Sequence, residues 1–276
     1  MANVNSVIPD IITRIVGRDR LTAEILFITG KVSNGSLTTD AQEIVKNDAE
    51  GTPIKKWMNA KTAAFSGDET FWNQDLYSQQ LNGEGKTIGT SGHGVIVPIS
   101  DPIKTYSSTD TLTSYVLKYN AANVGTNETP AYRISVCTID KAGNPVKRFK
   151  LGQAEGTGVF TYTANTKTLT FAEGDIAAGD QLFVQYDFNS ENCVAVIDSA
   201  NKFPKNIEIV VEGLFADACD NAVSGFTVFP KAQLSASTTA SFGRTDTFPF
   251  SFSAQQDYCD GEKQLFRQVF PTFPTT

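Results

Sequence analysis

Residues 182–188 read Leu-Phe-Val-Gln-Tyr-Asp-Phe, and this stretch shows the pattern that decides the fold. A period of two turns one set of side chains toward a core and the other set away from it, which is typical of a β-strand. The side chains of the set expected to face the core fall on every second position: Leu182, Val184, Tyr186 and Phe188. The same alternation returns in residues 207–212 and 248–252. Short alternating stretches separated by turn signals predict a mainly β protein, a β-barrel or β-sandwich.

The composition agrees with a globular β-rich chain. The 276 residues include 19 Phe and 8 Tyr, and 40% of them are hydrophobic. Aromatic residues are enriched in strands, and this hydrophobic content disfavours intrinsic disorder. The formal net charge of −7 argues against a general nucleic-acid binder that relies on a basic face.

Histidine-based chemistry is nearly excluded, because His93 is the only histidine. A Ser-His-Asp triad or a zinc-histidine site would have to include it. The four cysteines are widely spaced and favour free thiols over a metal cluster. No signal peptide is recognisable, and the longest apolar runs are too short for a membrane anchor. We therefore expect no cofactor and no metal.

One helix is predicted over residues 67–81. Ser66 followed by Glu69 has the spacing of a capping box, and Asn82-Gly83 forms a plausible C-terminal stop. Four side chains at helical spacing are expected to pack the helix against the sheet: Trp72, Leu76, Tyr77 and Leu81. Residues 83–94 carry five glycines and are expected to form a loop. Residues 31–48 suit either a strand or a helix.

Several sequence patterns resemble catalytic or ligand-binding sites, but each is better explained as a loop, a turn or a core residue. Residues 83–87 resemble the end of a phosphate-binding loop, but Gln80 stands where that loop needs glycine. Asp217 and Asp220 are conceivable as a glycosidase pair, although acidic pairs in turns are far commoner. Another acidic group is expected to form a polar turn: Asp257, Asp260 and Glu262. Trp57 and Trp72 are expected to be core residues, with sugar stacking as the alternative.

The order of three stretches resembles the major tail tube proteins of long-tailed bacteriophages. In Asp48–Leu81, an acidic turn leads to a strand with the segment Ala60-Lys61-Thr62-Ala63-Ala64-Phe65 and then to the predicted helix. Asn206–Ser235 contains two strands around a polar turn with a cysteine. Phe248–Pro271 ends the chain's pattern with a strand, a polar segment and a last strand. The resemblance covers a third to a half of the chain.

The resemblance implies a single tail-tube-like domain over residues 1–276, with an N-terminal arm (1–20), a Gly-rich loop (83–94) and a possible insertion or β subdomain at about 104–202. It implies a structural virion protein and not an enzyme, located in the phage tail and assembled in the host cytoplasm. Copies of the chain would form rings, commonly hexameric, that stack into a tube. The tube would contact other tail proteins and conduct the genome DNA during ejection without binding it specifically.

The N-terminal arm and the Gly-rich loop are the expected ring-to-ring contacts. The candidate contact residues within them are Arg14, Arg18, Glu84, Lys86 and His93. Two other classes of function stay open on the sequence. One is a capsid decoration or adhesin-like β-sandwich that binds a shell or a host glycan. The other is a carbohydrate-active enzyme that uses two carboxylates.

Overall fold

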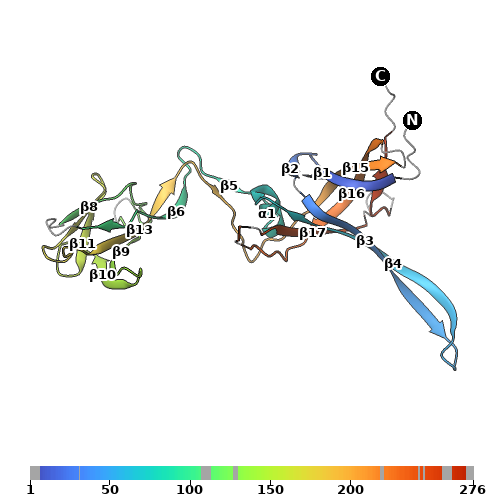
Figure 1. Cartoon of the computed structure of the whole chain (residues 1–276), viewed down its shortest axis with the longest axis horizontal. Helices are drawn as coiled ribbons and strands as arrows, with labels where there is room; N and C mark the ends of the chain where they lie inside the picture. Colours follow the sequence, from blue (N-terminus) through green and yellow to red (C-terminus); the bar gives the residue numbers. More distant parts are fainter. Residues whose placement is uncertain are drawn as a thin grey trace, which may run out of the picture. The chain divides into compact units, whose positions relative to one another are not determined.

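The computed structural model describes residues 7–30, 32–106, 113–126, 130–217, 221–241, 243–244, 246–256 and 263–271. Over these residues the chain is mainly β, as the alternation predicts, with one helix (Figure 1). It divides into two compact units, residues 1–87 with 196–276, and residues 88–195. The expected insertion at about 104–202 falls mostly within the second unit.

The first unit is built on one long sheet. Its strands run in the order β2 (Ile25–Thr29), β1 (Val7–Arg18), β15 (Asn206–Asp217), β16 (Ala222–Leu234), β17 (Phe248–Ala254), β4 (Pro53–Glu69) and β3 (Val32–Asn47), and β18 (Arg267–Val269) also pairs with β16. β1 and β3 approach each other, so the sheet curls into an open barrel. The alternating stretches 207–212 and 248–252 lie in β15 and β17, as predicted.

The barrel interior holds a core of aromatic and β-branched side chains. Phe65, Phe229 and Phe252 meet at its centre, with ring centroids of Phe65 and Phe252 5.2 Å apart and those of Phe229 and Phe252 4.9 Å apart. Ile15 and Ile209 are fully buried beside them. The alternation read from the sequence therefore builds this core directly.

The second unit is a smaller β structure with its own core. Its strand order is β6 (Val95–Ser100), β13 (Gln181–Ser190), β9 (Ile134–Ile139), β10 (Pro145–Leu151), β11 (Val159–Thr163), β12 (Thr168–Phe171) and β8 (Ser114–Val116), and β7 (Lys104–Thr105) also pairs with β13. A separate short pair joins β5 (Thr87–Ile88) to β14 (Val194–Ala195). The side chains of Leu182, Val184 and Tyr186 are buried, as their spacing predicts.

A buried carboxylate organises the core of this second unit. The hydroxyls of Tyr115 and Tyr186 each donate to Asp101 at 3.1 Å, and the amide of Lys118 donates to it at 3.2 Å. Burial, with the nearby Asp101 charge as a further cause, raises the pKa of the Tyr115 hydroxyl. These buried polar groups thus hydrogen-bond to one another, as buried polar groups in folded proteins generally do.

The helix exists, but its predicted start is wrong. α1 spans Gln74–Leu81, whereas residues 67–69 belong to β4. Ser66 and Glu69 therefore form no capping box; Asn73 is the N-cap, and its side chain accepts from the amides of Asp75 and Leu76. The predicted stop is confirmed, because Asn82 is the C-cap and Gly83 has a φ of +66° that favours glycine.

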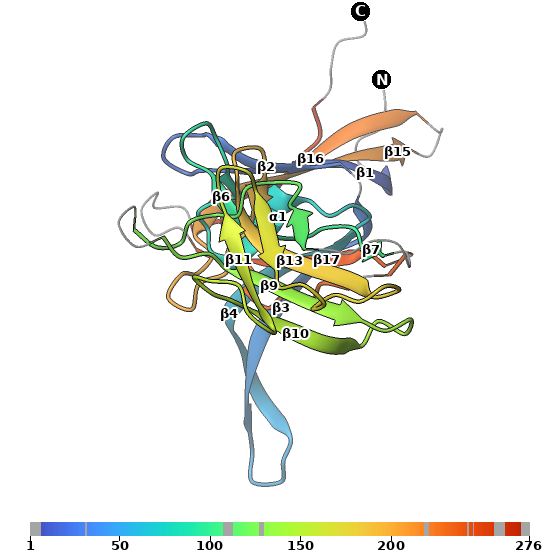
Figure 2. The same cartoon turned by 90° about the vertical axis from the view of Figure 1, so that its left-hand side faces the viewer.

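Residues 32–47 form a strand, which settles the ambiguity of residues 31–48 over the part that the structure describes. β3 and β4 form one continuous antiparallel hairpin that projects beyond the strands flanking it in the first unit (Figures 1 and 2). No helix in the described part of the chain is long and apolar enough to cross a membrane.

Candidate assembly interface

The most exposed feature of the first unit is the distal part of the β3–β4 hairpin, residues 38–62, which we call the arm. Every arm residue except Ala41 is exposed. Over the residues that the structure describes, the arm pairs with no strand other than its own two, whereas the base of β4 also pairs with β17 between Ala64 and Glu69. An isolated two-stranded hairpin is at best marginally stable in water, so the arm lacks the third strand or packed layer that usually supports one.

The tip of the arm is held by a compact acidic turn. The Asp48 side chain accepts from the amides of Glu50 and Thr52 at 3.0 and 2.8 Å. The Asp48 amide donates to the Thr52 carbonyl at 2.9 Å, and Gly51 takes a φ of +85°. Because aspartate and glycine are suited to these roles, the local sequence fixes the register of the whole arm.

One face of the arm combines apolar and cationic side chains. Ile44 lies directly opposite Trp57, and Lys46 lies directly opposite Lys55. The Lys55 ammonium lies 5.2 Å from the centroid of the Trp57 ring. Among the described residues neither of these two lysines forms an ion pair. We call this face, consisting of Ile44, Lys46, Lys55 and Trp57, the cationic face.

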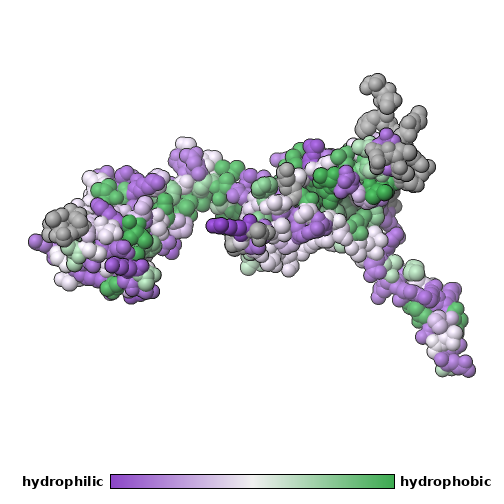
Figure 3. Space-filling view, in the orientation of Figure 1, coloured by the Kyte–Doolittle hydropathy of each residue, from purple (hydrophilic) through white to green (hydrophobic). Residues whose placement is uncertain are grey.

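The opposite face of the arm is compensated in charge. Lys56 forms an ion pair with Glu43 at 2.7 Å, and Glu43 lies opposite Met58. Met58 and Ile54 are 70% and 64% exposed. Both faces therefore carry exposed apolar groups, but the Glu43–Lys56 ion pair lies on one face, whereas Lys46 and Lys55 face each other without a carboxylate partner on the other. Green and purple surfaces accordingly alternate along the arm (Figure 3).

These features mark the arm as a binding element. Like charges directly across a ladder destabilise it, and burying exposed apolar groups lowers the free energy. Within the described residues of the chain, no carboxylate neutralises these lysines and no layer covers these apolar side chains. The expectation that Trp57 is a core residue is wrong: its side chain is 42% exposed, because no layer of the barrel extends beneath the arm.

The predicted contact residues Arg14 and Arg18 lie elsewhere, on the barrel. Residues 7–18 of the segment expected to be an N-terminal arm form the strand β1. Arg14 pairs with Glu212 at 2.9 Å, and Arg18 pairs with Glu208 at 2.7 Å, across the ladder between β1 and β15. Both arginines are thus engaged within their own chain.

The predicted contacts of the Gly-rich loop are spread over that loop. Lys86 pairs with Asp75 of α1 at 2.9 Å. Glu84 accepts a hydrogen bond from Lys202, which holds the pKa of this carboxyl below its usual value. His93 is exposed and exchanges two backbone hydrogen bonds with Thr90. Glu84 and Lys86 are thus engaged with different partners in the first unit, and His93 belongs to the second unit.

The helix-packing residues lie against the barrel and on its rim. Leu76 is buried in the first core. The Trp72 ring precedes the helix and lies 4.8 Å from Tyr77 and 4.9 Å from Phe248, while Leu81 is half-buried. Nearby, Glu69 is 4% exposed and accepts a hydrogen bond from the Thr29 hydroxyl. Burial raises the pKa of the Glu69 carboxyl.

The carboxylates considered for catalysis form no described pair. Asp217 is buried at the end of β15, where it accepts from the amide and side chain of Asn221 at 2.9 to 3.2 Å. That geometry is a turn cap. Four other acidic candidates lie outside the described residues: Asp220, Asp257, Asp260 and Glu262.

Sequence reasoning missed the arm lysines and Ile44. A signal for them was present, since lysines stand close to apolar residues on both sides of the Asp48–Pro53 turn. That signal is weak, because half-buried strands also carry neighbouring polar and apolar residues. Only the exposure of both faces separates an arm from a barrel strand.

Comparison with known families supplies the identity of the chain. The model of the YomU/Tube protein family matches residues 123–264, just over half of the 276 residues. No curated protein matches the chain. The matched range includes β9 to β13 of the second unit and β15 to β17 of the barrel. The resemblance to phage tail tube proteins is thereby confirmed, and the chain belongs to the YomU/Tube protein family.

Proposed function

We propose that this chain is the structural subunit of a phage tail tube, and that its copies assemble into rings that stack into a hollow conduit. The family supports a tube component of the virion tail. The ring, its sixfold symmetry, the stacking and the passage of DNA are part of our proposal. So is the view that the protein is not an enzyme, needs no cofactor and is assembled in the host cytoplasm.

The observation that carries the proposal is the arm. It is a long, exposed hairpin with apolar and charged groups that have no partner in the described part of its own chain. A head-to-tail contact, in which one surface meets a different surface of the next copy, generates rings or open filaments. An arm that reaches a second copy is therefore well suited to building a tube. The arm lies outside the range that the family model matches, so the two lines of support are independent.

The charge of the chain suits a conduit for DNA. The formal net charge is −7, and acidic walls repel phosphate groups. We propose that the genome slides through the lumen without specific binding, and that other tail proteins contact the ends of the tube.

Electron microscopy of the purified full chain at low and high concentration tests the proposal. We expect rings or tubes from the full chain. A shortened variant in which Asn-Gly replaces residues 42–60 closes the arm at the Ala41–Lys61 pair with a favoured hairpin turn. We expect this variant to keep its melting temperature and to remain as dispersed subunits.

A matched control shortens a different hairpin. Asn-Gly in place of residues 140–144 closes β9 and β10 at the Ile139–Pro145 pair and leaves the arm intact. We expect this control to assemble normally. A full chain that forms neither rings nor tubes would contradict the proposal, and tubes of normal length from the arm-shortened variant would show that assembly does not need the arm. A full chain that stays monomeric or trimeric, and that binds a capsid shell or a host glycan, would favour the decoration or adhesin alternative.

A further inference from the structure

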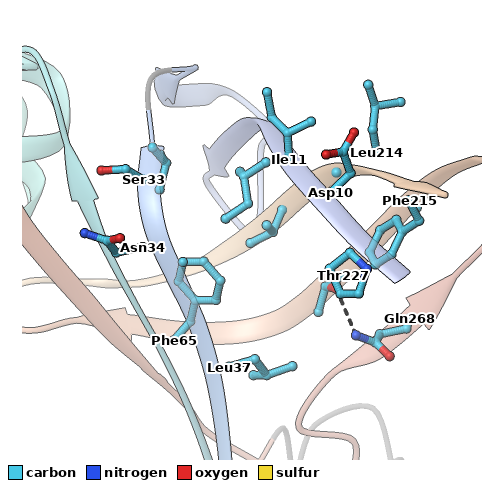
Figure 4. A pocket seen from close by; sticks show the side chains of 17 residues that line it. Asp10, Ile11, Ser33, Asn34, Leu37, Phe65, Leu214, Phe215, Thr227 and Gln268 are labelled. Carbon is cyan, nitrogen blue, oxygen red and sulfur yellow. Dashed lines mark hydrogen bonds between the residues drawn. The ribbon is translucent and has the colours of Figure 1, made fainter. Parts of the chain in front are cut away.

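A groove opens in the barrel where its sheet fails to close. β1 and β3 face each other across a seam, and the cavity between them has a volume of about 420 Å³ (Figure 4). Among the described residues no strand pairs with the free edge of β3, or with the second edge of β1 from Val7 to Arg14. We call this cavity the seam groove.

The two edges are shaped so that they do not pair with each other. The ladder of β1 shifts register between Pro9 and Ile11, and that of β3 shifts between Ser33 and Ser36. Pro9 has no amide to donate, and bulges bend a strand away from a neighbour. At one point the edges do approach, because the Ile12 side chain fills the space beside Gly35. The seam is thus a built feature of the barrel.

The lining of the seam groove is apolar and its rim is acidic. Ile12, Leu37 and Phe65 line it together with Val211. On one rim lies the exposed carboxylate of Asp10 on β1. On the other rim, Asn34 donates to the Asp68 carboxylate at 2.9 Å. Neither carboxylate forms an ion pair among the described residues, and the two cations on β1, Arg14 and Arg18, are engaged by Glu212 and Glu208.

The seam groove and the cationic face of the arm are complementary. The groove offers an apolar floor between two carboxylates. The cationic face offers Ile44 and Trp57 beside the unpaired Lys46 and Lys55. Opposite charges across an interface steer the encounter of two molecules and fix their register. The opposite face of the arm lacks this complementarity, because Glu43 already neutralises Lys56.

The arm cannot reach the seam groove of its own chain. Leu37 lines the groove, and Ile44 lies seven residues farther along the same strand, about 23 Å away at the usual strand rise. The two strands of the arm stay paired from base to tip, with register shifts between Ala41 and Glu43 and between Lys46 and Asn47, so folding the arm back would break that pairing. The partner must be another molecule.

We propose that the cationic face of the arm of one copy docks on the seam groove of a second copy. This inference rests on the proposed function and names the two surfaces of its contact. The contact is head-to-tail, since each copy uses its arm in one direction and its groove in the other. It therefore propagates from copy to copy.

Charge reversal in two separate chains tests the proposal. One variant carries Lys46→Glu and Lys55→Glu on the arm, and the other carries Asp10→Lys on the groove rim. We expect each variant alone to need at least tenfold more protein for assembly than the natural chain. An equal mixture of the two variants should assemble within about threefold of the natural concentration, because every arm then meets a groove of opposite charge.

The control exchanges charges on the opposite face of the arm. Glu43→Lys combined with Lys56→Glu keeps that ion pair and should leave assembly unchanged. Thermal melting of each variant at low concentration checks the fold, and Asp10, Lys46 and Lys55 are exposed, so we expect no loss of stability. A photo-reactive benzoylphenylalanine at position 57 should cross-link to peptides from residues 8–12 or 211–215. The same group at position 58 should not.

The outcomes separate this inference from the proposed function. If the arm-shortened chain fails to assemble but the charge variants behave as the natural chain does and the cross-links map elsewhere, the groove assignment is wrong and the tube proposal stands. If the arm-shortened chain forms tubes, the groove assignment is wrong and the tube proposal stands without the arm. If the full chain forms neither rings nor tubes, the proposed function is wrong. If arm reversal abolishes binding to a labelled DNA duplex without changing assembly, the cationic face serves nucleic acid and the groove assignment is again wrong.

Discussion

The base and the arm of the β3–β4 hairpin share the same two strands and one ladder, yet they differ in every surrounding contact. At the base, Ala63, Phe65 and Glu69 are buried, and β17 pairs with the second edge of β4. Along the arm both faces are exposed, and no third strand from the described part of the chain pairs with it. The comparison shows that a strand is stabilised by the layer that packs beneath it and by a neighbouring strand on its second edge. Pairing with one other strand does not by itself supply this stability.

Truncating one aromatic residue in each half should give the largest difference. Phe65→Ala removes a ring that stacks on Phe252, and we expect a loss of about 3–5 kcal/mol in the free energy of unfolding. Trp57→Ala removes an exposed ring, and we expect a change below about 0.5 kcal/mol. Urea unfolding of the dilute protein measures both values. Equal losses would mean that the arm is packed in solution.

Assembly should depend on Trp57, although the stability of the fold does not. Trp57→Ala should weaken self-association, because the ring lies on the proposed docking face. Sedimentation at several concentrations measures this effect. Unchanged association of Trp57→Ala would argue against a docking role for the cationic face.

The buried carboxylate at the base gives a pH-dependent prediction. Burial raises the pKa of Glu69, so the neutral form is favoured in the folded chain. The stabilisation that this group contributes is fully present below the ordinary carboxyl pKa and is lost as the pH rises through the raised value. Glu69→Gln should therefore match the natural chain near pH 4 and be more stable at neutral pH. Denaturant midpoints across this range, taken as a difference between the two chains, measure the effect. A variant that is less stable at neutral pH would contradict it.

A smaller effect is expected where the base of the hairpin continues into the helix. The Asn73 side chain caps α1 and also donates to the carbonyl of Ile28 at 2.8 Å. Asn73→Ala should cost about 1 kcal/mol of stability, the usual effect of losing an N-cap. Ser66→Ala, the residue that the sequence pattern wrongly suggests as the cap, should cost less than half as much. A larger cost for Ser66→Ala in thermal melting would reverse this assignment.

The smallest expected effect lies in the arm itself. Lys46→Glu places opposite charges across the ladder from Lys55, which should stabilise the free arm by about 0.2–1 kcal/mol. The same change should weaken assembly. Amide exchange within the arm of the dilute protein measures the first effect, and the concentration needed for assembly measures the second. If Lys46→Glu strengthened both the free arm and assembly, the lysines would not face a partner.

The barrel and the second core could be predicted from the sequence because they follow from alternation. Leu182, Val184 and Tyr186 become buried on one face, as period two requires. The start of the helix could not be placed, because a serine and a glutamate at capping spacing also occur by chance in strands. In the structure β4 continues through Ser66 to Glu69, and its side chains at Ala63, Phe65 and Glu69 are buried in alternation.

The candidate interface could not be found in the same way. Ile44 and Trp57 look like core residues in the sequence, and only the missing layer beneath them exposes both. Likewise, Asp10 and Leu37 are 27 positions apart, and the seam that brings them to one groove depends on bulges in two different strands. Long-range register of this kind is set by the whole sheet and not by local sequence.

Hydrogen exchange of residues 40–60 in dilute and in assembled protein tests the central claim most directly. Our account predicts that these amides exchange rapidly in the dilute protein, since the arm is supported only by itself, and that they become protected on assembly. The amides of residues 63–69 serve as the internal reference, protected in both states. Arm amides that exchange equally fast in the assembled and the dilute protein would contradict the claim that the arm joins one copy to the next.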